Sequence, residues 1–278
     1  MASNRKALCV GINLFKNYPG ATLQGCVNDA RDMGKLLKAL LGFKNADITT
    51  LTDAQATKAK IMSNLNSMVA DAKAGKYSYL VFSLSSHGTQ VPDTSGDEPD
   101  RADEAFCPHD LAQKGNAWDP SYIIVDDELH DLFVQLPANV LLEVYLDTCH
   151  SGTGLKAVDM LLDRKPRYMP PPSLEAFLKV DGRRSRGLHQ GLLDKGITHH
   201  ILWAGCRADQ TSADAHIGGS WHGAFTYYFA KEMRASQNKV SRLEILKRTI
   251  ADLKEGHYTQ IPQLEGEATV RKAIIAKS

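Results

Sequence analysis

Apolar and polar residues follow two different spacings along the chain, and these spacings predict its secondary structure. Short runs of apolar and β-branched residues predict buried strands at residues 6–13, 47–52, 77–87, 140–149 and 198–205. Apolar residues at helical spacing predict amphipathic helices at residues 29–41, 57–74, 127–136, 223–235 and 241–255. Strands that alternate with helices in this way predict an α/β fold, with a mostly parallel central sheet between helices on both faces.

Two segments follow neither spacing. Residues 89–121 are polar and rich in turn formers, with six acidic residues from Asp93 to Glu104. Residues 159–196 contain four prolines and many basic residues. A long stretch of this kind inside a compact domain is usually functional or disordered. We therefore expect residues 159–196 to be a linker between a large part, at about residues 1–158, and a small part, at residues 197–278.

Length, charge and cysteine content limit the class of protein. A chain of 278 residues suits one domain, and a net charge of +1 argues against nucleic-acid or membrane-surface partners. Five cysteines without C-x-x-C spacing favour free thiols in a reducing compartment. No apolar run approaches the roughly 18 residues of a membrane span, and the first residues lack the apolar core of a secretory signal. We expect a cytoplasmic protein and favour a monomer.

Two of the predicted strands end in residues that can act together in catalysis. One strand ends in Cys149, and another ends in His87, which is followed by Gly88. Neighbouring parallel strands have their carboxyl ends at the same edge of a sheet, where open α/β proteins keep their sites. A thiolate is the reactive form of cysteine, and a histidine base raises its fraction. We therefore expect Cys149 to be a nucleophile and His87 its base.

Neighbouring residues refine this assignment. His150 is the competing base, but adjacent residues of an extended chain face opposite ways, which favours His87. No third member of the catalytic group is evident. Gly88 lets a substrate backbone approach, so the amides of Gly88 and Cys149 are the expected oxyanion donors. Asp147 lies two residues before Cys149 and so projects on the same side of the strand.

The sequence around these residues resembles the caspase-like cysteine peptidases, and among them the metacaspases and the bacterial orthocaspases. Animal caspases instead carry Gln-Ala-Cys-x-Gly around the cysteine. The resemblance implies a three-layer caspase-like sandwich and an endopeptidase with a Cys–His dyad. It rests on five blocks that span nearly the whole chain in the expected order: Gly25-Cys-Val-Asn-Asp29-Ala, Ser85-Ser-His-Gly88, Val125-Asp-Asp-Glu128, Asp147-Thr-Cys-His-Ser-Gly152 and Gly223-Ala-Phe-Thr-Tyr227.

The resemblance also implies a substrate pocket for the residue before the cleaved bond. In metacaspases the residues matching Asp29, Asp147 and Ser85 line this pocket. Two carboxylates there would attract arginine or lysine and repel aspartate. We therefore expect protein or peptide substrates with Arg or Lys at that position. We also expect self-cleavage within the basic linker, in an exposed segment, with the candidates Arg183, Arg184 and Arg186.

A calcium site is a further implication of the resemblance, but one ligand is missing. In many metacaspases Ca²⁺ is bound by aspartates matching Asp103, Asp126 and Asp127, and by one seven residues after the cysteine. That position is Lys156 here, whose ammonium would lie where the ion binds, although Asp159 offers a shifted carboxylate. We expect that the chemistry requires no cofactor and that activity depends little on Ca²⁺.

Two other functions are compatible with these motifs. A catalytically silent relative would bind basic peptides, but such a module has no use for a paired base and thiol. A protease of the legumain or gingipain type shares the His-Gly and Cys strand ends. The blocks that end at Asp29 and Glu128 favour a metacaspase over this second alternative.

Overall fold

The fold is built around one six-stranded sheet. The computed structural model describes residues 4–92, 102–150, 164–180 and 199–275. The strand order is β14-β11-β9-β3-β1-β2, and only the pairing of β11 with β14 is antiparallel. The mostly parallel sheet expected from the sequence is confirmed. Its strands are β1 (Arg5–Gly11), β2 (Ile48–Thr52), β3 (Tyr79–Ser85), β9 (Leu141–Asp147), β11 (His200–Ala204) and β14 (Gln263–Glu265).

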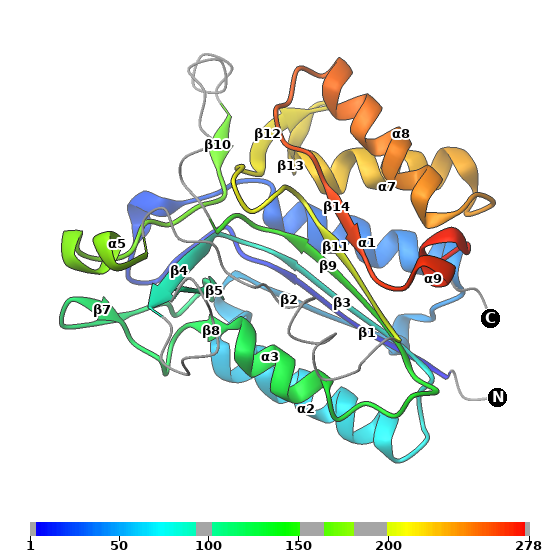
Figure 1. Ribbon diagram of the computed structural model, residues 1–278, viewed down its shortest axis with the longest axis horizontal. Coiled ribbons are helices and arrows are strands. Elements are labelled where there is room, and N and C mark those ends of the chain that lie inside the picture. Colours follow the sequence, from blue (N-terminus) through cyan, green and yellow to red (C-terminus); the bar gives the residue numbers. More distant parts are fainter. Residues whose placement is uncertain (1–3, 93–101, 151–163, 181–198, 276–278) are drawn as a thin grey trace.

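Helices cover both faces of this sheet (Figure 1). Because successive residues of a strand point to opposite faces, each strand contributes to two hydrophobic cores. In β3, Leu80 and Phe82 belong to the core under α2 and α3, whereas Tyr79 and Val81 belong to the core under α1 and α7. The helices are α1 (Cys26–Leu41), α7 (Ala224–Ser236) and α8 (Arg242–Glu255) on one face, and α2 (Lys58–Lys73) and α3 (Asp126–Phe133) on the other.

Local signals in the sequence account for several helix boundaries. Thr57 precedes α2, and its side chain accepts a hydrogen bond from the amide of Lys60, as an N-cap residue does. Gly42 follows α1 with φ 70°, a left-handed conformation that glycine adopts without strain. The expected helices are therefore present, with boundaries shifted by up to three residues.

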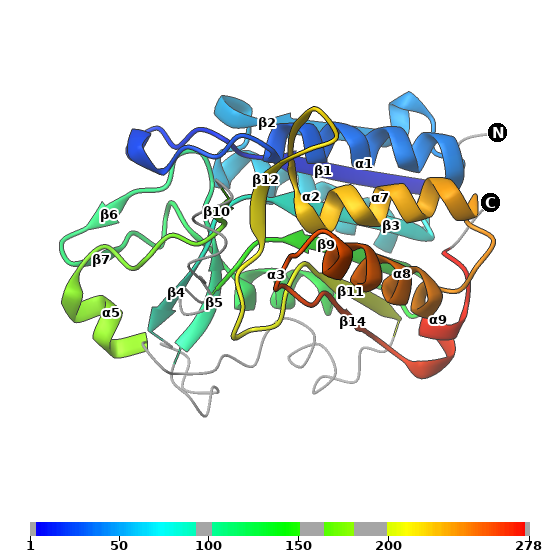
Figure 2. The same cartoon turned by 90° about the horizontal axis from the view of Figure 1, so that it is seen from above.

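Short elements gather at the edge where the parallel strands end (Figure 2). The sequence did not predict most of them, because strands of two to five residues carry little periodicity. One three-stranded sheet contains β4 (Gly88–Pro92), β5 (Ala102–Phe106) and β8 (Ile124–Val125), and another contains β10 (Lys165–Pro166), β12 (Ala213–Ile217) and β13 (Ser220–Gly223). The other elements at this edge are the hairpin β6 (Gln113–Lys114) and β7 (Ala117–Trp118), the helix α5 (Leu174–Val180), and the single turns Pro19–Ala21 and Asp53–Gln55. The helix α9 (Ala268–Lys272) and the turn Asn45–Asp47, which directly precedes β2, lie at the opposite edge.

The described part of the expected linker is folded against this edge. Residues 164–180 include β10 and α5, and β10 pairs antiparallel with β12. Arg167 has an exposed fraction of 0%, so the expectation that the basic residues of this segment are exposed is wrong for Arg167. It is buried because it lies among acidic side chains. Within the described residues, no helix is both long and apolar enough to cross a membrane.

A buried ion pair joins the sheet to α8. The Nε of Arg242 lies 2.9 Å from Oε1 of Glu143, a fully buried residue of β9. Glu143 also accepts hydrogen bonds from the Tyr79 hydroxyl (2.8 Å) and the Trp203 indole N–H (3.0 Å). Although burial opposes ionisation, Arg242 and these donors hold the pKa of Glu143 below its usual value.

Candidate active site

Cys149 and His87 are brought together because β3 and β9 are direct neighbours. Their parallel register pairs Ser85 with Asp147. His87 and Cys149 each follow two residues later, so both leave the sheet at the same level of its carboxyl edge. Both side chains are buried, with exposed fractions of 5% and 0%. The two strand ends therefore lie side by side at the carboxyl edge of the sheet.

The sulfur of Cys149 contacts the segment after β11. It accepts a hydrogen bond from the backbone amide of Ser212 and lies 3.6 Å from the carbonyl oxygen of the same residue. The sulfur of Cys206 lies 3.7 Å away. Within the described residues, no hydrogen bond links Cys149 to His87. The thiol and the candidate base are thus neighbours that are not paired in this arrangement.

The imidazole of His87 is held by the main chain. Its Nε2 lies 2.8 Å from the carbonyl oxygen of Ala21, and the ring packs 5.1 Å from that of Phe15. A carbonyl can only accept, so Nε2 carries the proton and Nδ1 is the basic nitrogen. Burial lowers the pKa of His87 to about 4, against the effect of the Ala21 hydrogen bond. Ala21 thus orients the imidazole of His87, a contact that sequence could not reveal because it belongs to a backbone oxygen.

The imidazole of His150, the competing base, contacts β4 and β5. Its Nδ1 lies 3.2 Å from the carbonyl oxygen of Thr89, and its ring packs edge-on against Phe106 at 5.0 Å. Its Nε2 lies 3.6 Å from the carboxylate of Glu104. Its Nε2 also lies 3.4 Å from the Thr148 hydroxyl, so these polar contacts hold the ring away from the sulfur's contacts at Ser212.

Two backbone amides converge on a single carbonyl oxygen. The amides of Gly88 and Cys149 donate to the carbonyl oxygen of Arg167, at 2.9 and 3.2 Å. A Cβ atom at Gly88 would lie 2.1 Å from the carbonyl oxygen of Cys149, so only glycine fits there. These are the two amides expected to stabilise an oxyanion. In this structure Arg167 provides the oxygen that they bind.

The side chain of Arg167 fills a pocket lined by three carboxylates. Its Nη2 donates to Asp29 at 2.6 Å and to Asp214 at 3.0 Å. Its Nη1 donates to the carbonyl oxygen of Asp147 at 3.1 Å and lies 3.3 Å from the Asp147 carboxylate. Burial opposes ionisation of the guanidinium, but the carboxylates raise the pKa of Arg167 well above its usual value, so it remains charged. The pocket is therefore a binding site for a cation.

Surrounding elements fix each carboxylate. Asp147 accepts hydrogen bonds from the Ser212 hydroxyl (2.5 Å) and from the amide and hydroxyl of Thr226 (3.0 and 2.7 Å) at the start of α7. The amide of Gly223 donates to both oxygens of Asp29. These donors fix the positions of the two carboxylates around the guanidinium. Burial raises the pKa of Asp29 against the opposing effect of Arg167.

The expected lining of this pocket was incomplete. Ser85 is buried beside Asp147, but its hydroxyl makes no hydrogen bond to Arg167 within the described residues. Sequence reasoning missed Asp214, which follows β11 in the run Thr211-Ser212-Ala213-Asp214. The carboxyl end of β11 lies at the same edge as those of β3 and β9. The rule that selected Cys149 and His87 could therefore have directed attention to this run.

The backbone around Arg167 is bound as an extended strand. The amide of Arg167 donates to the carbonyl oxygen of Ser212 at 3.0 Å, and Pro166 and Lys165 pair with the first residues of β12. On the other side, the amide of Met169 donates to the carbonyl oxygen of Gly88 at 2.9 Å. Residues on both sides of Arg167 are thus held across the carboxyl edge of the sheet.

Several expected features cannot be located. Lys156, Asp159 and the candidate self-cleavage residues Arg183, Arg184 and Arg186 lie outside the described residues. Asp103 and Asp126 are buried on neighbouring elements, with Asp127 beside them. Among the residues that the structure describes, no three His, Cys, Asp or Glu side chains form a group that could hold a metal ion.

Comparison with solved structures identifies the fold. The structure superposes on Caspase-1 from Spodoptera frugiperda with a TM-score of 0.62 and 12% identity, over 99% of this chain and 92% of the other. Protein GSU0716 from Geobacter sulfurreducens gives a TM-score of 0.66 and 24% identity, over 99% of both chains. The fold is thus the caspase-like α/β fold that the sequence resemblance implied.

The sequence then identifies the family. Residues 5–158 match the family model of the metacaspase, peptidase C14 domain. Metacaspase-1 of Emericella nidulans is 32% identical over 293 residues, which cover 94% of this chain and 69% of the relative. Metacaspase-1A of Aspergillus fumigatus is 33% identical over 293 residues, 94% of this chain and 68% of the relative. The chain belongs to the metacaspase family of caspase-like cysteine peptidases, which sets aside the legumain or gingipain alternative.

Proposed function

We propose that the protein cleaves polypeptides after arginine or lysine, with Cys149 as the nucleophile and His87 as the base. The observation that supports this most directly is the position of Arg167. Its guanidinium is bound by Asp29, Asp147 and Asp214, while its carbonyl oxygen accepts two backbone amides. A substrate residue needs these same two contacts before the cleaved bond, one for recognition and one for catalysis.

The proposed reaction has two stages. The thiolate of Cys149 attacks the carbonyl carbon of the bound residue, and the electron pair of the C=O bond moves onto the oxygen held by the two amides. The tetrahedral intermediate collapses, the C–N bond breaks, and His87 gives the leaving amine the proton it took from the thiol. Water then attacks the acyl-enzyme with His87 as base, which releases the new carboxylate and restores the thiol.

The environment of His87 supports its role as a base. The hydrogen bond to Ala21 fixes the tautomer in which Nδ1 accepts a proton. Burial lowers the pKa of His87 to about 4, and the positive charge of Arg167 contributes to this lowering. His87 is therefore unprotonated at neutral pH, and its Nδ1 is able to accept a proton.

Self-cleavage is part of the proposal. Arg167 lies in the pocket, so the bond from Arg167 to Tyr168 is the first candidate, while Arg183, Arg184 and Arg186 offer further basic sites. In the structure the Cys149 sulfur contacts Ser212, so it must turn from Ser212 before it attacks. We therefore interpret the arrangement as a latent form with its own substrate bound.

Peptides that differ only at the residue before the cleaved bond test the specificity. We expect cleavage after arginine and lysine, and none after aspartate or citrulline, which keeps the shape of arginine but lacks its charge. Cys149→Ala should lose all turnover and keep its circular dichroism spectrum. Equal cleavage after arginine and citrulline would show that the carboxylates do not select charge, and preferential cleavage after aspartate would overturn the proposal.

Intact-mass measurements test the self-cleavage. Purified wild type should yield a fragment that begins at Tyr168, and Cys149→Ala should not. Arg167→Gln should lose that fragment, whereas Lys179→Gln should keep it, because Lys179 is exposed and pairs with Glu175 at the surface. A wild type that remains intact, or that is cut only after residues 183–186, would contradict cleavage at Arg167.

A silent binding module remains the second candidate. The observation that favours it is the contact of the Cys149 sulfur with Ser212 instead of His87. Such a module would bind arginine peptides in the same pocket without turnover. Fluorescence anisotropy with a labelled arginine peptide, run beside the cleavage assay, separates the two functions. Binding without cleavage would favour the module.

We also propose a monomer in a reducing compartment such as the cytoplasm. All five cysteines are buried free thiols, which suits such a compartment. Light scattering after size exclusion tests the monomer, and imaging of the tagged protein in its native cell tests the location. A dimeric mass or a secreted product would contradict this proposal.

A further inference from the structure

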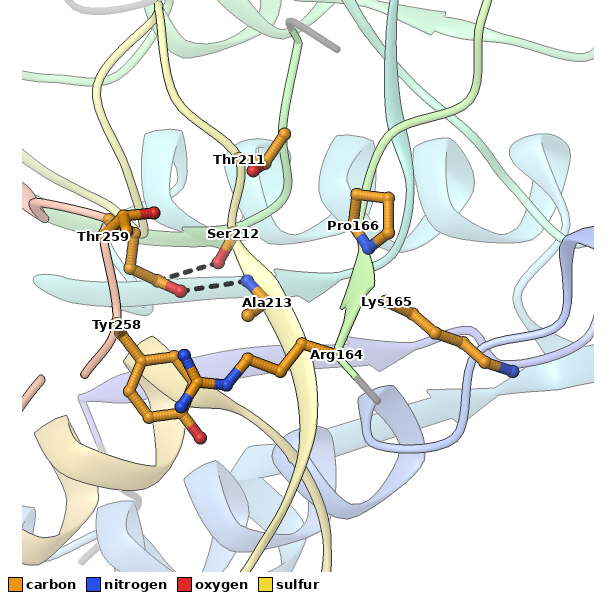
Figure 3. A pocket seen from close by; sticks show the side chains of 9 residues that line it. Arg164, Lys165, Pro166, Thr211, Ser212, Ala213, Tyr258 and Thr259 are labelled. Carbon is orange, nitrogen blue, oxygen red and sulfur yellow. Dashed lines mark hydrogen bonds between the residues drawn. The ribbon is translucent and has the colours of Figure 1, made fainter. Parts of the chain in front are cut away.

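A second arginine of the same segment occupies a site of its own. Arg164 lies three residues before Arg167, and its guanidinium carbon lies 3.7 Å from the centre of the Tyr258 ring. Its Nη1 donates to the carbonyl oxygen of His257 at 2.7 Å, and its Nη2 donates to that of Gly256 at 2.8 Å. Figure 3 shows the guanidinium lying across the ring at the side of a pocket between β10, β12 and the Tyr258 segment.

The register of the backbone relates this site to the pocket of Arg167. The antiparallel pairing of β10 with β12 holds Lys165 and Pro166 in extended conformation between the two arginines. Side chains of an extended chain alternate, so Arg164 and Pro166 point to one side and Arg167 to the other. Any substrate that pairs with β12 in the same register would therefore present its fourth residue before the cleaved bond to Tyr258.

The surroundings of Arg164 suit a planar cation. Gly256 and His257 directly follow α8, so their carbonyl groups lie at the negative end of the helix dipole. His257 has φ 58°, in the left-handed region. The face of Tyr258 attracts a cation, and Tyr228 supports the ring edge-on at a centroid distance of 5.9 Å.

We propose that Tyr258 and the carbonyl groups of Gly256 and His257 form a subsite that selects arginine three residues before the basic residue at the cleaved bond. This inference rests on the proposed function and defines its substrate class as segments of the type Arg-x-x-Arg. A guanidinium can stack flat on the ring and donate to two carbonyl groups at once, whereas an ammonium is a compact charge without a planar face. Arginine is therefore preferred over lysine here.

The recognising groups belong to a part of the chain that is separate from the bound segment. The backbone of Tyr258 is tied to α8 by a hydrogen bond from its amide to the carbonyl oxygen of Leu253 at 2.8 Å. The neighbouring Gln260 bonds to the amide of Ala213 in β12 (2.9 Å) and to the Ser212 hydroxyl (3.1 Å), as Figure 3 shows. These contacts do not involve Arg164, so the subsite keeps its shape when the segment leaves.

Three fluorogenic peptides test the inference: Arg-Lys-Pro-Arg, Lys-Lys-Pro-Arg and Ala-Lys-Pro-Arg, each as an amide of the same dye. Each is measured far below KM on one wild-type preparation, so the ratio of rates equals the ratio of kcat/KM. The active fraction and any competition from the chain's own segment cancel in that ratio. We expect kcat/KM for the arginine peptide to exceed that for the alanine peptide about tenfold, with the lysine peptide between them. Arginine can make a cation–π contact and charged hydrogen bonds in the subsite, and alanine can make neither.

Variants at Tyr258 assign the selectivity to this ring. Tyr258→Leu should reduce the arginine-to-alanine ratio to about twofold or less, and Tyr258→Phe should preserve it, since the ring face remains. Tyr122→Leu is a control, because Tyr122 is 40% exposed and lies on a different loop. Equal cleavage of the three peptides by wild type would overturn the subsite and leave the proposed function standing. Failure to cleave any of them would overturn both.

Discussion

The carboxylate of Asp214 lies 3.0 Å from the guanidinium of Arg167 and also accepts the backbone amides of Gln24 and Gly25, at 2.8 and 2.9 Å. Gly25 directly precedes α1, the helix that carries Asp29. Asp214 therefore fixes the loop that leads into α1, and α1 carries Asp29 into the same pocket. The negative charge of the pocket is held in place by the main chain, so little reorganisation is needed when a cation binds.

Loss of the charge at Asp214 should weaken cleavage after arginine. Asp214→Asn keeps the size of the side chain but removes a charge-assisted hydrogen bond worth about 1.5–3 kcal/mol, so kcat/KM should fall at least about tenfold. Asp209→Asn, in the exposed part of the same loop, should have no effect. Steady-state kinetics with arginine and lysine peptides provide the measurement. Unchanged kinetics in Asp214→Asn would show that Asp29 and Asp147 suffice.

A methyl group at Gly223 should close the pocket. A Cβ atom there would lie 2.2 Å from Oδ2 of Asp147 and 2.4 Å from Nη1 of Arg167. The guanidinium would have to move by more than an ångström, and such a displacement costs about a hundredfold in rate. Gly20→Ala is the matched control, since a Cβ at Gly20 meets nothing within 4 Å. Normal cleavage after arginine by Gly223→Ala would mean that substrates bind elsewhere.

The burial of His87 should make folding depend on pH. Burial lowers the pKa of His87 to about 4 in the folded chain, whereas the pKa of an exposed histidine is about 6.5. Between these values the unfolded chain binds a proton that the folded chain does not, so stability is lost as pH falls from about 6.5 towards 4. In a Cys149→Ala background, His87→Gln should remove up to about 3 kcal/mol of this loss. Urea unfolding at pH 7 and pH 4.5 measures how much unfolding free energy each variant loses. Equal losses in the two variants would show that His87 is not the group responsible.

The buried pair of Glu143 and Arg242 should contribute strongly to stability. Glu143→Ala leaves the guanidinium buried without its partner, so the free energy of unfolding should fall by about 3–5 kcal/mol. Glu244→Ala removes a surface pair with Arg248 and should cost no more than about 0.5 kcal/mol. Urea titration in the Cys149→Ala background compares them. Equal losses would show that the core tolerates an unpaired Arg242.

Much of the central fold could be predicted because its signals are local. The strands that end near Cys149 and His87 are long apolar runs, and the rule that parallel strands share a carboxyl edge then brings the two residues together. The short strands β10 and β12 could not be predicted in the same way. Their pairing depends on contacts between segments about 50 residues apart, such as Lys165 with Asp214, and such contacts leave no periodic pattern.

The composition of residues 159–196 was misleading for a physical reason. Prolines and basic residues are typical of exposed linkers, and the sequence alone gives no sign that a single arginine has acidic partners. Arg167 is buried because Asp29, Asp147 and Asp214 come from three distant elements. The orienting carbonyl group of Ala21 was equally hidden, since a backbone oxygen is present at every residue.

Because Arg167 belongs to the same polypeptide as the pocket it fills, dilution cannot remove it. A tethered ligand faces its site at an effective concentration in the millimolar range, so a free substrate must compete against that level. A cut made within one molecule is a first-order event, and its half-time does not change with protein concentration, whereas a cut between molecules accelerates as concentration rises. Under the proposed self-cleavage, the bond after Arg167 breaks once in each molecule. Its first-order rate would then be set by how readily the sulfur of Cys149 leaves the amide of Ser212.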